Sequence, residues 1–125
     1  MSHHGAHAPA PALRREQVDL MRILAYGYER NGLPARAVVL WAALHALWPQ
    51  DLRISQSLAF ARLRSGKPEL ALALLDSLLD AGDASALTHL LRSQSLVKIG
   101  RLVEAARSMR FYVAARAEPH QRKEP

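Results

Sequence analysis

The sequence predicts an all-α protein built from three tandem helical hairpins, that is, from six antiparallel helices. The prediction rests on the composition, on a 34-residue period and on the positions of two prolines. Half of the 125 residues are hydrophobic but only 6% are aromatic, and alanine and leucine dominate. Both residues enter a helix at little entropic cost. At this length one domain with a modest core is expected.

The period is set by three glycines. Gly32, Gly66 and Gly100 follow one another at intervals of 34 residues. An alanine lies five residues after each glycine, large apolar residues lie nine and twelve after it, and a small residue lies seven before it. In that order the positions are Ala37, Ala71 and Ala105; Trp41, Leu75 and Met109; Leu44, Leu78 and Tyr112; and Ala25, Ala59 and Ser93. Three copies predict three repeats of one unit, at about 18–51, 52–85 and 86–119.

Each repeat has the features of a helical hairpin. Glycine can end the first helix in the left-handed conformation at no steric cost. Pro34 and Pro68 follow at first-turn positions, where a missing N–H matters little. The small residues allow the paired helices to approach closely, and Trp41 and Trp48 are expected in the core. The predicted helices cover residues 12–31, 34–48, 52–65, 68–81, 85–99 and 102–117.

Two short segments are expected to lie outside the helical domain, which we place at residues 13–118. Residues 1–12 form a tail rich in histidine, proline and alanine, and 119–125 form a polar, frayed tail. The first segment lacks the apolar core of a secretory signal. No stretch reaches the roughly 18–20 apolar residues of a membrane span. Since cysteine is absent, disulfide bonds are excluded, and the cytosol is the expected compartment.

The register resembles that of the tetratricopeptide repeat (TPR), over residues 18–119. Tyr28, Ala37 and Pro49 match signature positions in the first copy. The departures are Met21, Ser55 and His89 at the usual early tryptophan, Asp83 and Ala117 at the terminal proline, and Arg92 at a leucine. The resemblance implies a short right-handed superhelix in which the first helix of each pair lines a concave groove.

That groove is the expected partner-binding surface. Its positions, carried over from the family, are Asp19, Arg22, Tyr26 and Glu29; Arg53, Gln56, Phe60 and Leu63; and Leu87, Leu90, Gln94 and Val97. The surface is charged in the first copy and becomes apolar towards the third. Phe60, Leu63, Leu90 and Val97 are expected to form a contiguous apolar patch, of a kind that soluble monomers seldom leave uncovered. The alternative is that some of these residues pack under the neighbouring repeat.

The groove lacks the asparagines with which some family members bind a peptide's terminal carboxylate. Family members that clamp a peptide's terminal carboxylate need asparagines at positions that here hold Tyr26, Phe60 and Gln94. A carboxylate clamp is therefore not expected, and an apolar or amphipathic segment fits better. The partner-binding residues that we predict are Arg22, Tyr26, Gln56, Phe60, Leu63, Leu90, Gln94, Val97 and Phe111.

Phe111 belongs to a second expected surface, on the last helix. The main stripe of that helix is predicted to be Leu102, Ala105, Met109, Tyr112 and Arg116, and Phe111 lies off it. Solenoids need a polar outer face at their ends. An exposed phenylalanine on an uncapped last helix therefore suggests that a partner covers it, although a lone surface aromatic is an equally good interpretation.

No catalytic, metal or cofactor site is predicted. The candidates are His3, His4 and His7; Asp76, Asp80 and Asp83; and His45 and His89. The first group lies in the proline- and alanine-rich tail. The aspartates fit a solvated face better than a magnesium site, which needs more convergent oxygens. The last two histidines have no sequence neighbour with which to form a nucleophile–base pair. The chain is therefore not expected to be an enzyme.

The size and the charge of the chain indicate which of the many functions of this family it is expected to have. Three repeats with short tails resemble the small type III secretion chaperones of the YscY kind, through residues 26–51 and 100–119. The resemblance implies a heterodimer with a small YscX-like secretion-system protein, and docking at the export gate. The alternatives are a chaperone for a needle or translocator subunit and a general scaffold or assembly factor. The net charge of +6 comes mostly from singly scattered arginines, so an RNA-binding helical repeat is only a third interpretation.

Overall fold

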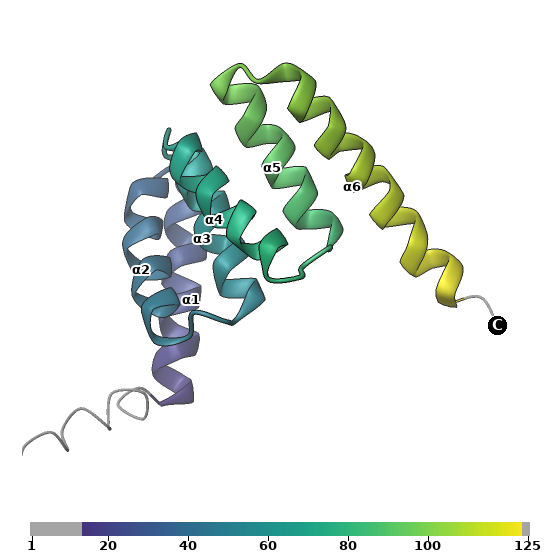
Figure 1. The fold of residues 1–125 in the computed structure, drawn as a ribbon. Coiled ribbons are helices and arrows are strands. Elements are labelled where there is room, and N and C mark those ends of the chain that lie inside the picture. Colours follow the sequence, from purple (N-terminus) through teal and green to yellow (C-terminus); the bar gives the residue numbers. More distant parts are fainter. Residues whose placement is uncertain (1–13, 124–125) are drawn as a thin grey trace, which may run out of the picture.

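Six α-helices make up the part of the chain that the structure describes (Figure 1). The structure is a computed structural model that describes residues 14–123, with the side chains of residues 14–118. The helices are α1 (Arg15–Arg30), α2 (Pro34–Leu47), α3 (Leu52–Arg64), α4 (Pro68–Asp80), α5 (Ala86–Ile99) and α6 (Leu102–Lys123). Residues 14–123 contain no strand. The predicted all-α class is confirmed, and the first five helices lie within three residues of their predicted ends.

The three periodic glycines end α1, α3 and α5. Gly32, Gly66 and Gly100 have φ angles of 73°, 82° and 92°. In each case the following residue donates its N–H to a carbonyl of the helix that has just ended, at 2.7–2.9 Å. The pairs are Leu33 with Tyr28, Lys67 with Arg62, and Arg101 with Leu96. This bonding satisfies carbonyls that a helix end would otherwise leave unpaired.

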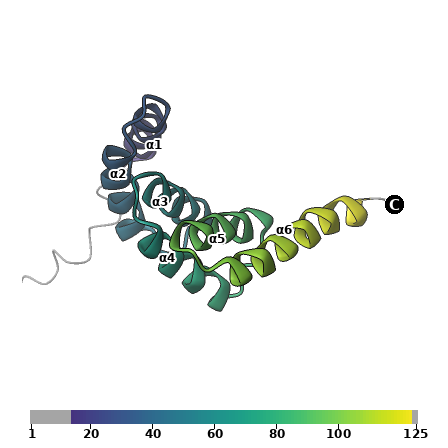
Figure 2. The same ribbon diagram turned by 90° about the horizontal axis from the view of Figure 1, so that it is seen from above.

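Consecutive helices pack against one another in a series. Each helix contacts the next one in the chain, and α3 also contacts α5. Figures 1 and 2 show α6 running back along α5 after the turn at Gly100. Seen from above, the helices follow an arc from α1 and α2, through α3 and α4, to α5 and α6 (Figure 2). Among the helices of residues 14–123, none is long and apolar enough to cross a membrane.

The core consists of three clusters along this arc. The first surrounds Trp41, which is completely buried, and it includes Leu44 and Leu58. The second contains Leu63 and Leu75, and the third contains Leu96. The small residues of the repeat are buried between the helices, as predicted from their spacing: Ala25, Ala37, Ala59, Ala71, Ser93 and Ala105.

The last helix differs from its prediction. Of the predicted stripe, Ala105 is buried, but Leu102 and Met109 are 62% and 37% exposed. Ser108 is buried in their place. Because no further helix among residues 14–123 follows α6, only the side of α6 that faces α5 is covered. The helix also continues to Lys123, beyond the predicted end at 117, since no glycine stands there to stop it. The predicted tail at 1–12 lies outside the described residues.

Arg92 joins three helices. Its Nε donates to Asp76 Oδ1 of α4 at 2.6 Å, and its Nη1 donates to Ser108 Oγ of α6 at 2.7 Å. Arg92 therefore makes an ion pair and a hydrogen bond at a position where the pattern that the sequence resembles has leucine. Asp76, which we interpreted as part of a solvated face, is one partner of this contact.

Candidate functional site

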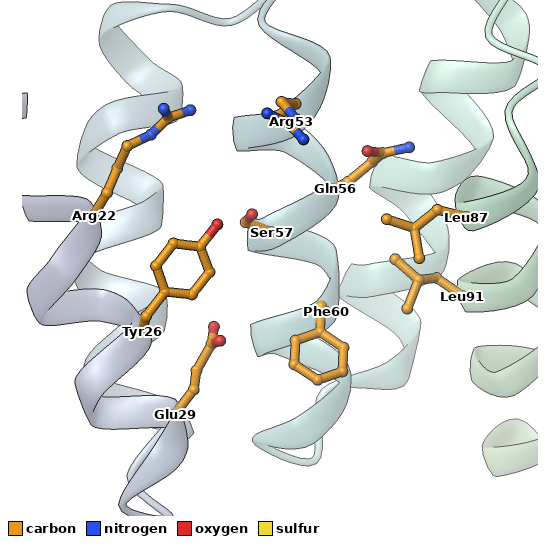
Figure 3. A pocket seen from close by; sticks show the side chains of 9 residues that line it. All are labelled: Arg22, Tyr26, Glu29, Arg53, Gln56, Ser57, Phe60, Leu87 and Leu91. Carbon is orange, nitrogen blue, oxygen red and sulfur yellow. The ribbon is translucent and has the colours of Figure 1, made fainter. Parts of the chain in front are cut away.

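Three adjoining cavities lie along α1, α3 and α5, and Phe60 lines all three. We call them together the groove. The first, of about 360 Å³, is lined by Arg22, Tyr26, Glu29, Arg53, Gln56, Ser57, Phe60, Leu87 and Leu91 (Figure 3). The second, of about 340 Å³, is lined by Tyr26, Glu29, Arg30, Pro34, Phe60 and Arg64. The third, of about 490 Å³, is lined by Phe60, Leu63, Arg64, Ser93, Gln94, Val97, Lys98 and Met109.

The α1 wall of the groove rests on the first core cluster. The ring of Tyr26 packs edge-on against the buried Trp41, with 5.2 Å between the ring centroids. Trp41 also donates its Nε1–H to Glu29 Oε2 at 3.0 Å. Trp41 therefore holds an aromatic ring and a carboxylate of α1 in place at the surface of the groove.

Glu29 is a half-buried carboxylate that lines the first two cavities. Burial disfavours its charged form and raises its pKa above the ordinary value for glutamate. The hydrogen bond from Trp41 and the attraction of Arg64 act in the opposite direction without cancelling this effect. The charged form of Glu29 is therefore less favoured than that of an exposed glutamate.

A polar network joins α3 to the start of α5. The side-chain amide of Gln56 donates to the hydroxyl oxygens of Ser85 and Thr88, each at 3.0 Å. Gln56 is only 7% exposed. Gln56 is one of the predicted partner-binding residues, and the structure shows that its amide is already hydrogen-bonded within the protein. Its amide lines the first cavity but is used to hold two helices together.

Asp83 anchors the same network. Its Oδ1 accepts the backbone N–H of Ser85 at 2.9 Å, and its Oδ2 accepts the hydroxyl hydrogen of Thr88. Burial alone would raise the pKa of Asp83, but the hydrogen bonds from Thr88 and Ser85 outweigh it and the pKa is lowered. Asp83 is therefore a structural carboxylate at the turn that precedes α5.

The apolar end of the groove contains only part of the predicted patch. Phe60 is half-buried and Val97 is 53% exposed, and both face the third cavity with Met109. Leu63 lines this cavity too, but it is 8% exposed and packs in the second core cluster. Leu90 is half-buried and lines none of the three cavities. The alternative of packing under a neighbouring helix is therefore the correct one for Leu63.

Basic side chains surround the groove. Of the charged residues that line it, five are cations and one is an anion: Arg22, Arg30, Arg53, Arg64 and Lys98 against Glu29. The guanidinium of Arg64 lies over the ring of Phe60, 5.8 Å from its centroid. Arg64 is not among the predicted groove residues, although it lies four residues after Phe60 and therefore on the same helix face.

Other lining residues could not be predicted from the repeat positions. Leu91 and Ser57 lie beside the family's groove-facing positions. Met109 comes from α6, the second helix of its hairpin, and lines the third cavity together with Val97 of α5. Gln94 is exposed and lines that cavity, as predicted.

The second predicted surface is also partly as expected. Phe111 is 53% exposed, and its ring stacks on His89 of α5 with 5.3 Å between centroids. Burial lowers the pKa of His89, and Arg92 lowers it further against the opposing effect of Asp83. The predicted exposure of Phe111 is confirmed, whereas its stacking partner could not be identified from the sequence.

Ser55 and His45 are ten residues apart in the sequence, but their side chains lie close together. Ser55 Oγ lies 3.3 Å from His45 Nδ1, a contact typical of a nucleophile and its base. Ser55 is completely buried, at the wall of a cavity of about 760 Å³ that His45 also lines. Within the described residues, no group of three or more His, Asp or Glu side chains is placed to hold a metal ion.

No protein-family model matches this chain, and no curated protein is significantly similar to it. The groove is therefore the observation from which a function can be argued.

Proposed function

We propose that this protein is a non-enzymatic binding protein whose groove covers an amphipathic segment of a small protein partner. The observation that carries the proposal is the meeting of three cavities at Phe60. Exposed apolar side chains of three helices surround this point: Tyr26 on α1, Leu87 and Val97 on α5, and Met109 on α6. Contiguous apolar surface of this kind marks an interaction site more often than a free surface. An amphipathic segment buries such side chains by packing its apolar face into the groove.

We further infer that the hairpins are tetratricopeptide repeats stacked in a right-handed superhelix. The 34-residue glycine spacing, the buried small residues and a groove lined mainly by α1, α3 and α5 support this inference. Among such proteins, the chain resembles the cytoplasmic type III secretion chaperones of the YscY kind. The partner would then be a small YscX-like secretion-system protein, and the complex would dock at the export gate. A chaperone for a needle or translocator subunit and a general scaffold are the alternatives.

The test is a titration of the partner recovered from the native cell against a Phe60→Ala/Val97→Ala variant. Each side chain buried on binding contributes roughly 1.5–3 kcal/mol. The double variant should therefore bind about a hundredfold more weakly or worse if the two effects add. Val103→Ala is the matched control, because Val103 is 81% exposed on α6 and lines none of the three cavities.

Circular dichroism establishes that each variant remains helical before binding is compared. Unchanged affinity of a folded double variant would exclude the groove as the partner site. Phe111→Ala would then be the next variant to measure, because Phe111 marks the second exposed surface.

A further inference from the structure

We propose that the segment bound in the groove is acidic, with a side-chain carboxylate between Arg22 and Arg53 and an apolar side chain beside Phe60. This inference rests on the proposed function and names the chemistry of the partner. It is argued from the charge balance of the groove, from one unpaired buried donor and from the arrangement of the first cavity.

The charge balance favours an anionic ligand. Five cationic side chains line the three cavities against the single carboxylate of Glu29. Glu29 is half-buried and already accepts a hydrogen bond from Trp41. The local excess of positive charge is therefore larger than the whole-chain charge of +6 over 125 residues implies. Such a cavity attracts negatively charged groups and repels cationic ones.

Arg22 lacks a partner that its position requires. Its Nε is buried and has no hydrogen-bond partner among residues 14–118. A buried donor without a partner costs free energy, and more so when the donor is charged. Arg53, on the opposite wall, is exposed and pairs with no described carboxylate. A ligand carboxylate in the first cavity would lie against the guanidinium groups of Arg22 and Arg53, which both line it, and a guanidinium binds a carboxylate through two parallel hydrogen bonds.

The first cavity separates polar and apolar contacts. Figure 3 shows the guanidinium groups of Arg22 on α1 and Arg53 on α3 at the same end of the cavity, and the ring of Phe60 at the other. Leu87 and Leu91 of α5 form the facing wall. A peptide that carries an acidic residue close to a leucine or phenylalanine would place its carboxylate against the two arginines and its apolar side chain against Phe60.

The aliphatic wall favours a peptide over a nucleic acid. Single-stranded RNA could place phosphates on the arginines and stack bases on Tyr26 and Phe60. Leu87, Leu91 and Val97, however, offer no aromatic face on which a base could stack. They match the aliphatic side chains of an amphipathic peptide instead.

The experiment selects phage-displayed random short peptides against the full-length protein and three variants. Arg22→Gln/Arg53→Gln removes the two guanidinium groups. Lys67→Gln/Arg110→Gln removes the same charge from positions outside the three cavities, and Phe60→Ala removes the apolar contact. Circular dichroism of each variant confirms that it is folded.

The parent protein and the Lys67/Arg110 variant should both select peptides in which Asp or Glu lies near Leu or Phe. The Arg22/Arg53 variant should lose the acidic preference and keep the apolar one. For one selected peptide, either this variant or a Glu→Gln change in the peptide should weaken binding about tenfold or more. Combining the two changes should cost little beyond either one alone.

Any of four results would overturn the inference. Peptides that bind the parent without acidic residues would exclude an acidic partner but leave the proposed function standing. Failure to select any peptide, or equal selection by the Phe60→Ala variant, would contradict the proposed function as well. Tighter binding of a single-stranded RNA oligonucleotide than of any selected peptide, lost in the Arg22/Arg53 variant, would assign the groove to nucleic acid.

Discussion

Trp41 links the core of the protein to the surface of its groove. The indole is completely buried, yet its one N–H reaches the carboxylate of Glu29, and its ring supports Tyr26. A buried indole nitrogen needs an acceptor, and here the acceptor is a group that a partner could also contact. Trp41 therefore connects the packing of the first hairpin to the positions of Tyr26 and Glu29 in the groove.

Glu29→Gln should stabilise the protein slightly at neutral pH. The glutamine carbonyl can still accept the Trp41 N–H, while the cost of enclosing a charge is removed. Because the pKa of Glu29 is raised in the folded state, folding favours its protonated form. Stability linked to this group is therefore present at acid pH and is lost as the pH rises through its folded pKa.

Thermal unfolding of the two proteins as a function of pH measures this effect. The variant should unfold at a higher temperature than the parent at pH near 7. The difference should vanish below about pH 4, where glutamate is protonated. A variant less stable than the parent at neutral pH would mean that the attraction of Arg64 exceeds the cost of burial.

Among the helices and turns, two glycines are expected to affect stability in opposite ways. Gly66 has a φ angle of 82° between α3 and α4, whereas Gly27 lies inside α1. A Cβ atom at either position would meet no other atom within 4 Å. Any difference between the two substitutions to alanine therefore comes from the backbone alone.

Gly66→Ala should destabilise the protein by about 1–2 kcal/mol, since an L-residue is strained in the left-handed conformation. Gly27→Ala should stabilise it by up to about 1 kcal/mol through helix propensity. Urea denaturation of both variants measures the two changes. If they shift the midpoint in the same direction, the turn at Gly66 does not have the conformation described here.

Ala71→Leu tests the contact between α3 and α4. Ala71 is completely buried in the second core cluster with Ala59 and Leu75. Three added carbons should force the helices apart, at a cost of about 1–3 kcal/mol. Ala73→Leu, on the exposed face of the same helix, is the control and should change the unfolding midpoint little. Equal effects of the two substitutions would contradict the packing of α4.

At the scale of the whole molecule, the architecture is a series rather than a closed bundle. Helices contact mainly their neighbours in the chain, so the three core clusters are arranged along an arc without a common centre. Stability in such arrays is approximately a sum of local terms and nearest-neighbour interfaces. The ends of the array can therefore open more easily than its middle.

Leu96→Ala should loosen α5 and α6 while α1 to α3 stay protected. Leu96 is completely buried in the third cluster, which joins α4, α5 and α6. Its truncation should cost about 2–5 kcal/mol locally. Hydrogen-exchange mass spectrometry should show faster exchange in residues 86–118 than in the parent, with little change in residues 15–64. Uniformly faster exchange would show that the protein unfolds as one cooperative unit.

The sequence alone determined the helices, their glycine-terminated turns and the buried small residues. Each of these depends on local backbone preferences and on a spacing that repeats every 34 residues. The turn at Gly66 and the burial of Ala71 could therefore be predicted without knowing which residues contact them in the folded protein. The groove helices could also be named, because Tyr26, Phe60 and Gln94 occupy equivalent places in the 34-residue repeat.

Only the tertiary structure decided which of the groove residues remain available to a partner. Leu63 is buried, Gln56 is engaged by Ser85 and Thr88, and Met109 enters the third cavity from the last helix. Each outcome depends on contacts between helices that are distant in the sequence, or on the absence of a covering helix beyond α6 among the described residues. A periodic pattern specifies which face of a helix is apolar, but the burial of one side chain depends on which neighbouring atoms lie against it.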